Sequence, residues 1–180
     1  MNLNDYILKE IKTFTLQSTV ESAQNTCKEF PITHIIVVEN EELIGCFSES
    51  DIQTLENKNE QLKTYTYLLQ PFFTGINSTV LELLKQFADY DSNIIPVLTE
   101  EKKYLGYYDL SDILDVFSTS PFLNDELITL VVEKIEKEYT MSEVSQIVES
   151  NHGRISGMYV SKKINDKIQI TLKIAQKELN

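Results

Sequence analysis

A segment of eight residues occurs twice in this chain of 180 residues. Residues 45–52 read Gly-Cys-Phe-Ser-Glu-Ser-Asp-Ile, and residues 106–113 read Gly-Tyr-Tyr-Asp-Leu-Ser-Asp-Ile. Both copies begin with glycine, carry an aromatic third residue and end in Ser-Asp-Ile. Such a duplication restricts the fold to two similar units that are built from the same succession of helices and strands.

The repetition extends upstream of the shared segment. Ser-Thr-Val stands at 18–20 and again at 78–80, an offset of 60 residues. Ile-Val-Val at 36–38 and Pro-Val-Leu at 96–98 keep that offset, whereas the glycines are 61 residues apart. The extra residue falls in a polar turn, where a loop tolerates an insertion.

Each copy contains the signals of two helices and two strands. A threonine precedes an apolar stripe at helical spacing, a run rich in β-branched residues follows, and a polar turn leads into a second run. We therefore predict a β-α-β-β-α unit in each copy, with a short helical segment before it. The predicted elements are a helix capped by Thr19 or Thr79, a strand over 35–38 or 94–98, a strand over 43–47 or 104–108, and a helix from Ser48 or Asp109.

The remainder of the chain has a different pattern. Strands are predicted over 127–133, 155–160 and 168–174, and a helix over 142–150. Asn-His-Gly at 151–153 reads as the stop of that helix, with glycine at the C′ position. The fold class is α/β (α+β): two repeats over 1–60 and 61–120, then a β-α-β-β unit over 124–180. We expect the strand over 168–174 to pair edge to edge with a second copy.

Composition and charge exclude several classes of protein. The net charge of −12 and the single arginine, Arg154, argue against nucleic-acid binding, because an acidic surface repels phosphate backbones. No apolar run approaches the ~20 residues that span a bilayer, and no export signal is visible, so we expect a cytoplasmic protein with no membrane partner. Cys27 and Cys46 fit a reducing compartment as small buried hydrophobes.

No pattern typical of catalysis is present, so we predict that the protein is not an enzyme. His34 and His152 read as boundary residues of a strand and a helix, and no Cys/His pair has zinc spacing, so we predict neither catalytic nor metal-binding residues. The Asp-Tyr-Asp sequence at 89–91 is interpreted as a solvated turn between a helix and a strand.

The duplicated half resembles a tandem of cystathionine-β-synthase (CBS) domains, on the strength of Ser-Thr-Val before each first helix, the 36–38 and 96–98 strands and the two Gly-x-x-[Ser/Asp]-x-x-Asp segments. The tail resembles a truncated ACT-like (ferredoxin-like) domain. The combination is similar to the bacterial regulatory proteins of the acetoin-utilisation type. This resemblance implies a homodimer that acts on another protein, as yet unknown.

The CBS resemblance also implies a ligand site at the first repeated segment. There Ser48 would hold phosphate, Asp51 would accept from ribose hydroxyls, and Gly45 and Phe47 would lie beside the ligand. A hydroxyl at a helix N-terminus suits an anion. The same Ser48-x-x-Asp51 spacing equally fits a helix cap, and both interpretations stand.

The second copy predicts a weaker site at Gly106, Tyr108, Asp109 and Asp112. Asp109 stands where Ser48 stands in the first copy, and a carboxylate about 4 Å from a phosphate costs on the order of 1–4 kcal/mol. If a nucleotide binds, we expect it in the first copy alone.

Two functions follow from these observations. The first is a small regulatory module that senses an adenine nucleotide or nucleoside and signals by conformation or oligomerisation. No cofactor is obligatory, and AMP, ADP, ATP or S-adenosylmethionine are the candidate ligands. The alternative is a scaffold or interaction protein with degenerate CBS sites and a dimerising tail.

Overall fold

The computed structural model describes residues 2–123 and 126–176. The chain divides into two compact units, Met1–Phe117 and Ser118–Asn180, which are described separately below. The predicted limits of the tail domain, residues 124 and 180, lie outside the described residues.

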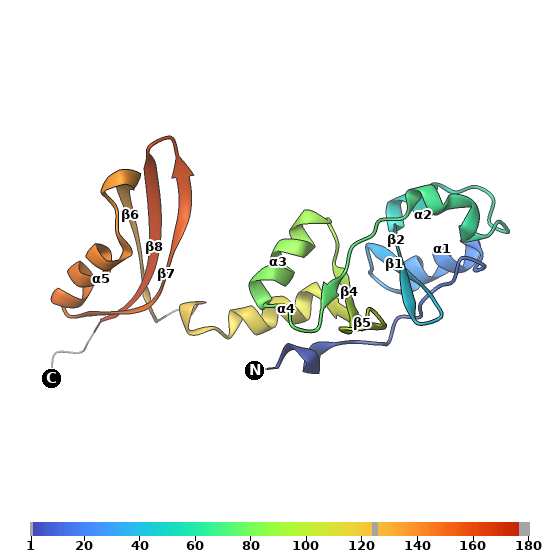
Figure 1. Ribbon diagram of the computed structural model, residues 1–180, viewed down its shortest axis with the longest axis horizontal. Helices are drawn as coiled ribbons and strands as arrows, with labels where there is room; N and C mark the ends of the chain where they lie inside the picture. Colours follow the sequence, from blue (N-terminus) through green and yellow to red (C-terminus); the bar gives the residue numbers. More distant parts are fainter. Residues whose placement is uncertain (1, 124–125, 177–180) are drawn as a thin grey trace. The chain divides into compact units, whose positions relative to one another are not determined.

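The first copy of the repeat has the predicted helices and strands (Figure 1). Thr19 caps the first helix, because its hydroxyl accepts from the backbone N–H of Ser22. Ser48 caps the second helix in the same way. The elements are η1 (Leu3–Tyr6), α1 (Val20–Glu29), β1 (His34–Glu39), β2 (Glu42–Ser48) and α2 (Glu49–Thr54).

The second copy repeats this succession. Thr79 and Glu82 form a reciprocal capping box at the start of its first helix, which satisfies two N–H groups that lack an intrahelical partner. The elements are η2 (Leu62–Leu68), β3 (Thr74–Gly75), α3 (Val80–Asp89), β4 (Ile94–Leu98), β5 (Tyr104–Asp109) and α4 (Leu110–Ser118).

Strand pairing confirms the duplication residue by residue. Val37 lies opposite Gly45 in the first hairpin, and Val97 lies opposite Gly106 in the second. Each register shifts directly after that valine, so the extra residue of the second copy is accommodated in the turn. The first strand of each repeat is short: it is a single parallel bridge from Phe14 in one copy and β3 in the other.

The segment that enters each repeat pairs with the hairpin of the other repeat. Cys46 in β2 exchanges backbone hydrogen bonds with Gln70, at 2.9 and 2.8 Å. Tyr107 in β5 exchanges them with Leu8, at 2.8 and 3.0 Å. The two repeats are therefore interlocked by two equivalent antiparallel bridges.

One hydrophobic core serves both repeats. Large side chains from either copy are fully buried in it, because each hairpin is covered by helices on one face and by the other repeat elsewhere. Cys46 lies in this core as a free thiol, and Cys27 is a free thiol at half-buried depth, in keeping with the interpretation of both as small hydrophobes. The fully buried residues include Ile35, Phe47, Ile52, Leu62, Phe72, Leu83, Ile94, Ile95, Tyr108 and Ile113.

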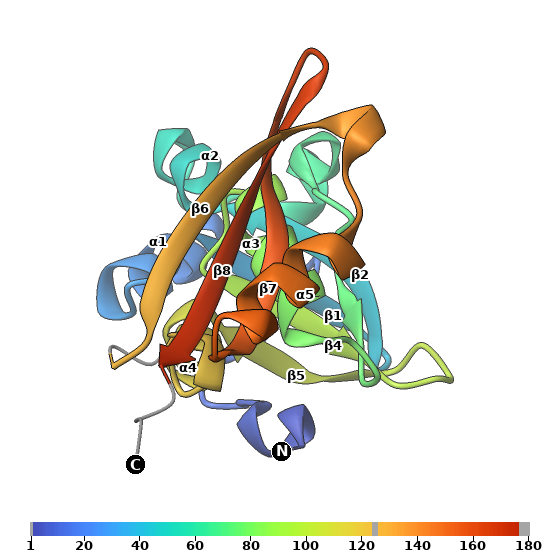
Figure 2. The same cartoon turned by 90° about the vertical axis from the view of Figure 1, so that its left-hand side faces the viewer.

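The second unit is the predicted β-α-β-β arrangement (Figure 2). Its antiparallel sheet has the order β6-β8-β7, and Val144 and Val148 of the helix pack on Ile168, Ile170 and Leu172. The central position of β8 makes the prediction of edge pairing through 168–174 wrong, since both of its edges are already paired. The elements are η3 (Pro121–Leu123), β6 (Ile128–Ile135), η4 (Glu136–Glu138), α5 (Met141–Ser150), β7 (Gly153–Ile164) and β8 (Lys167–Gln176).

The stop of α5 differs from the prediction in one residue. Asn151 is the C-cap, so the left-handed residue at C′ is His152, with φ of +63°, and not Gly153. Gly153 instead begins β7, where an added Cβ would lie 2.7 Å from the Val148 side chain. The glycine is needed for close approach of strand and helix.

None of the helices within the described residues is long and apolar enough to cross a membrane.

The two backbone bridges that interlock the repeats predict different losses of stability when alanine replaces each of three glycines. In Gly106→Ala the new Cβ would lie 2.4 Å from the Leu8 carbonyl oxygen, whereas in Gly45→Ala the nearest atoms lie at 3.2 Å and in Gly75→Ala none lies within 4 Å. We expect Gly106→Ala to lower the free energy of unfolding by about 3 kcal/mol and Gly45→Ala by about 1–2 kcal/mol. Gly75→Ala should change it by less than about 0.5 kcal/mol. Urea denaturation followed by circular dichroism measures the series, and equal stability of all three variants would contradict the interlock.

Candidate functional site

Ser48 and Asp51 are brought together at the start of α2. The Ser48 hydroxyl donates to Asp51 Oδ2 at 2.6 Å and accepts from the Asp51 backbone N–H at 3.0 Å. Ser48 is only 8% exposed, and Asp51 is half-buried. The predicted helix cap is therefore present, and the single hydrogen of the serine hydroxyl is used separately, in the bond to the Asp51 carboxylate.

These two residues lie on the wall of a cavity of about 390 Å³ in the first unit. Its lining comes from the N-terminal ends of β1 and α2, from the segment that crosses to the second repeat, and from the end of α3. The lining residues are Thr33, His34, Ser48, Glu49, Ser50, Asp51, Gln70, Tyr90 and Asp91. The interlock is what delivers Gln70, because its backbone is held on Cys46.

A polar cluster under the cavity links equivalent residues of the two repeats. Thr33 N–H donates to Asn93 Oδ1 at 2.9 Å, and Asn93 N–H donates to the Thr33 hydroxyl at 2.9 Å. The Thr33 hydroxyl donates its hydrogen to Asn93 Oδ1 at 3.0 Å, and the Asn93 amide group donates to the Pro31 carbonyl. Thr33 and Asn93 are 60 residues apart, so the pair lies where the two repeats meet.

His34 is buried beside this cluster, with 3% of its surface exposed. Its Nδ1 lies 3.0 Å from the Thr33 hydroxyl. Nε2 is buried and has no hydrogen-bond partner among the described residues. Burial lowers the pKa of His34 from its ordinary 6.5, against smaller raising contributions from Gln70, Asp91 and Asp51. The Gln70 side chain raises this pKa slightly, although Nε2 has no hydrogen-bond partner among the described residues.

Aromatic rings form a platform at the rim. Tyr90 stacks on Phe72 with ring centroids 4.6 Å apart and planes 15° apart, and Phe72 meets His34 edge-on at 5.1 Å. Phe72 is buried and Tyr90 is 40% exposed. The stack holds Tyr90 in one orientation at low entropic cost, as aromatic contact residues in binding sites are held.

The corresponding positions of the second repeat are crowded with acids. Asp109 accepts from the Ser111 backbone N–H at 2.8 Å, which closes a local turn. The pKa of Asp112 is raised, first by burial and then by Asp109, Asp115 and Glu10. A weaker anion site at these residues stays a prediction, which rests on the additional carboxylates there.

The remaining predicted site residues have roles in the fold. Phe47 and Tyr108 are fully buried in the core and do not line the cavity. Gly45 and Gly106 face the crossing segments, where an added Cβ would approach Gln70 or Leu8. The close approach that these glycines permit is to the protein backbone. Contact of any of the four with a ligand stays a prediction.

Much of the lining of this cavity is not predicted from the sequence. The sequence places His34 at a strand boundary, and Tyr90 and Asp91 in a solvated turn. The offset of 60 residues aligns Tyr90 and Asp91 with Phe30 and Pro31, so an unmatched polar pair at a repeated position was the available signal.

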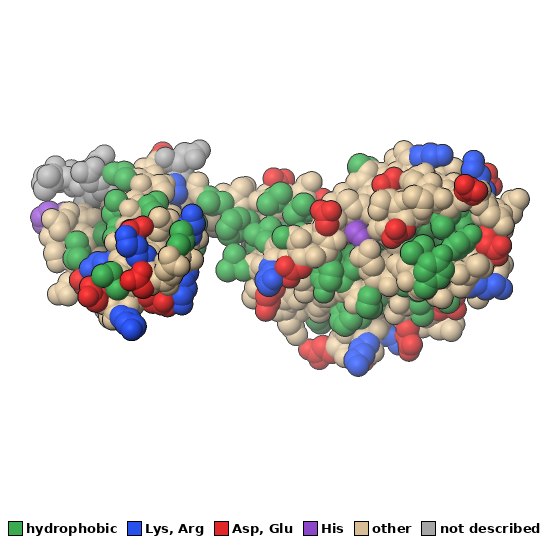
Figure 3. All heavy atoms as spheres, turned by 90° about the horizontal axis from the view of Figure 1, so that it is seen from above, with side chains coloured by type: hydrophobic (Ala, Val, Ile, Leu, Met, Phe, Trp, Pro, Cys, Tyr) green, Lys and Arg blue, Asp and Glu red, His purple; other side chains and the backbone are tan. Residues whose placement is uncertain are grey.

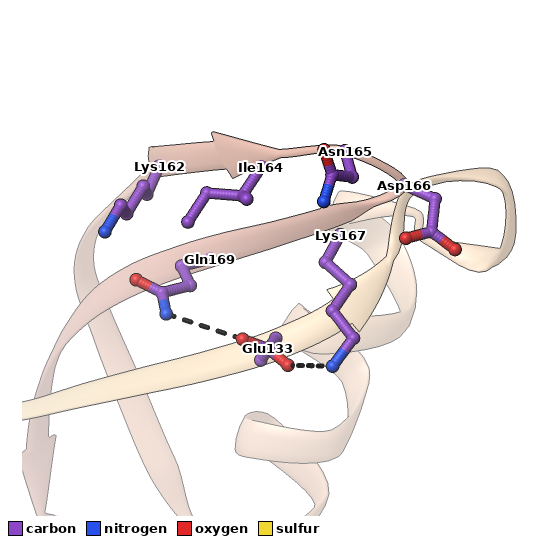
Figure 4. Close-up of a pocket in the computed structure, with 7 residues that line it drawn as sticks. All are labelled: Glu133, Lys162, Ile164, Asn165, Asp166, Lys167 and Gln169. Atoms are coloured by element: carbon purple, nitrogen blue, oxygen red, sulfur yellow. Dashed lines mark hydrogen bonds and ion pairs between the residues drawn. The ribbon is translucent and has the colours of Figure 1, made fainter.

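Two other depressions are weaker candidates for a ligand site. One, of about 310 Å³ at the tip of the β7–β8 hairpin, is bridged by an ion pair of 2.7 Å between Lys167 and Glu133 (Figure 4). The other, of about 290 Å³, lies on the exposed surface between Gly75 and Glu100. On the face of the first unit shown in Figure 3, hydrophobic side chains gather in several patches, with acidic and basic side chains scattered around them. The described residues contain no cluster of three His, Cys, Asp or Glu side chains that could hold a metal ion.

The buried His34 predicts a pH dependence. Because its pKa is lowered in the folded state, the unfolded chain binds the proton more tightly, and the free energy of unfolding should decrease as pH falls below about 6.5. NMR titration of the two histidine rings measures the pKa of His34. The variant His152→Gln removes the exposed ring, so that the remaining imidazole signals are those of His34. The His34 ring should titrate below pH 6.5, and a midpoint at or above 6.5 would contradict the described burial.

Comparison with protein families identifies one of the two repeats. The sequence profile of the CBS domain matches residues 70–119, which contain the crossing segment and the second hairpin with its helices.

Comparison with solved structures covers both repeats. A CBS domain pair/ACT domain protein from Thermotoga maritima is 17% identical, with a TM-score of 0.57, over 65% of this chain and 96% of that chain. The CBS domains of a transcriptional regulator from Streptococcus pneumoniae are 12% identical, with a TM-score of 0.55, over 64% of this chain and 98% of that one. The cytosolic domain of the Mg²⁺ channel MgtE in complex with ATP is 23% identical, with a TM-score of 0.51, over 62% and 46%.

These similarities agree with the interlocked β-α-β-β-α repeats and the shared core. Residues 70–119 match the CBS domain family, and the fold of the first unit is that of a CBS domain pair.

Proposed function

We propose that the protein is a cytoplasmic regulatory module that senses an adenine nucleotide or nucleoside through its CBS pair. The observation that carries this proposal is the cavity at Ser48 and Asp51, where a carboxylate and an exposed aromatic ring face the same space of about 390 Å³. Ring stacking on a base and carboxylate bonding to ribose hydroxyls are the ordinary means of nucleoside recognition. Candidate ligands are AMP, ADP, ATP, S-adenosylmethionine and adenosine.

The location of the cavity supports a role in signalling. Its walls come from both repeats, since Gln70, Tyr90 and Asp91 belong to the second and Ser48 and Asp51 to the first. A ligand that contacts both repeats can favour one arrangement of them over another, provided that its affinity for the two arrangements differs. The role is regulatory rather than catalytic, and the protein that receives the signal acts outside this chain.

A scaffold function is the second candidate. It is favoured by the Ser48 hydroxyl, whose hydrogen is already donated to Asp51, as in a helix that is merely capped. On this proposal the CBS sites are degenerate, and the ACT-like second unit acts by dimerisation alone.

Ligand-dependent melting separates the two candidates. At 100 times the dissociation constant a ligand of the folded state adds about 2.7 kcal/mol to the free energy of unfolding. We expect at least one of the candidate ligands to raise the melting temperature of the protein. Asp51→Asn should abolish the shift, because it removes the carboxylate proposed to bind the ribose hydroxyls, whereas the matched change Asp112→Asn in the second repeat should preserve it. Flat melting curves with every ligand would leave the scaffold function.

We also propose that the second unit forms a homodimer along β6. Four of the large exposed hydrophobic side chains lie on this eight-residue edge strand: Ile128, Leu130, Val131 and Ile135. β6 pairs with β8 without a bulge, whereas β7 at the other edge has two register shifts and carries Lys162 and Lys163. Bulges and lysines protect an edge from pairing, so β6 is the less protected of the two.

Analytical ultracentrifugation of the full chain tests this dimer. Val131→Lys places a charge on the β6 edge and should shift the protein to a monomer. Val160→Lys, a change of the same kind on β7, should leave the dimer intact. A wild-type monomer, or loss of the dimer in both variants, would overturn the assignment of β6.

A further inference from the structure

The charges around the cavity point to the kind of ligand that it accepts. Three of the nine lining residues are acids, namely Glu49, Asp51 and Asp91, and none of the nine is lysine or arginine. A phosphate group placed among them would have like charges nearby and no cationic side chain of the lining to pair with. One like-charge contact at about 4 Å lowers affinity roughly tenfold or more.

The expected phosphate donor is also occupied. The Ser48 hydroxyl donates its only hydrogen to Asp51 Oδ2, and its oxygen accepts from the Asp51 backbone N–H and lies 3.0 Å from the Ser50 hydroxyl, so it has no hydrogen left for a phosphate oxygen. The helix that it caps, α2, has only six residues, so few aligned peptide dipoles stand behind the cap. Neither feature favours an anion.

The buried imidazole is a hydrogen-bond acceptor as well. Nδ1 of His34 lies 3.0 Å from the Thr33 hydroxyl, whose hydrogen is donated to Asn93 Oδ1. On this hydrogen-bond network the ring proton is assigned to Nδ1. In that tautomer Nε2 is an acceptor, and it is buried without a partner among the described residues. A buried acceptor of this kind is stabilised when a ligand supplies an N–H or O–H group.

The polar groups of the cavity therefore share one preference. Asp51, Asp91 and His34 Nε2 accept hydrogen bonds, and Gln70 contributes the one side-chain amide. The flat surface is Tyr90, stacked on Phe72. A matching ligand is planar, carries several hydrogen-bond donors and has no negative charge.

We infer that the cavity selects an uncharged purine nucleoside with an exocyclic amine, such as adenosine, over the phosphorylated forms of that nucleoside. This inference rests on the proposed function, because it takes the adenine class as given and identifies which member binds. The amine and the ribose hydroxyls supply the donors that His34 and the carboxylates lack, and the absence of phosphate avoids repulsion by Glu49, Asp51 and Asp91.

Isothermal titration of the full chain with adenosine, AMP and ATP tests the selection. In the wild type, adenosine should bind at least tenfold more tightly than AMP, and ATP should bind no better than AMP. The preference should shrink at about 0.5 M salt, because screening weakens the repulsion between partly exposed charges.

Asp91→Asn is the diagnostic variant. Asp91 is exposed and has φ of +48°, a conformation that asparagine also adopts, so the fold should be retained. The ratio of the affinity for AMP to the affinity for adenosine should rise severalfold, and further in the double variant with Glu49→Gln, because each change removes a negative charge that repels phosphate. The control is Asp89→Asn. Asp89 is the last residue of α3, two residues before Asp91, and it is paired with Lys85 at 2.6 Å and does not line the cavity.

The outcomes separate the inference from the function beneath it. If adenosine binds more tightly and only the cavity variants improve AMP, the inference is supported. If AMP or ATP binds as tightly as adenosine, or is indifferent to Asp91→Asn, the selection is wrong and nucleotide sensing survives. If no adenine compound binds, the proposed function fails and this inference fails with it.

Discussion

The structure of the first unit depends on the exchange of backbone hydrogen bonds between its repeats. Cys46 holds the segment that enters the second repeat, and Tyr107 holds the segment that enters the first. Because the exchange is reciprocal, neither hairpin is complete without the other repeat, and the two copies bury one common core. The glycines of the duplicated segment follow from this constraint, since a Cβ at either position would meet the crossing backbone.

The same exchange creates the cavity. It places Gln70 against β2, and the contact between Thr33 and Asn93 brings the end of α3 toward the start of α2. Two nearly equivalent environments result from the duplication, but their side chains differ. One has a serine that caps α2, a buried imidazole and an aromatic stack, whereas the other has Asp112, whose pKa is raised by burial and then by Asp109. Equivalent positions of a duplicated fold thus carry different chemistry.

Ligand selection in such a site depends on which hydrogens are already used. The hydroxyls of Ser48 and Thr33 both donate within the protein, so neither is available as a donor to a phosphate group, and three acids line the cavity. A serine that looks suited to phosphate in the sequence becomes part of a helix cap in the fold. The proposed preference for an uncharged nucleoside is a consequence of this internal pairing.

The sequence by itself determined the repeats, the caps at Thr19, Thr79 and Ser48, and the β-α-β-β succession of the tail, because these follow from local periodicity and from residues close together in the chain. It could not show that His34, Gln70 and Tyr90 share a cavity with Asp51, since no local pattern records the proximity of residues that lie 17 to 56 positions apart in sequence. It also misplaced the left-handed residue after α5 and the position of β8 in its sheet. Those features were decided by tertiary structure, because strand neighbours and close approaches are set by how whole elements pack.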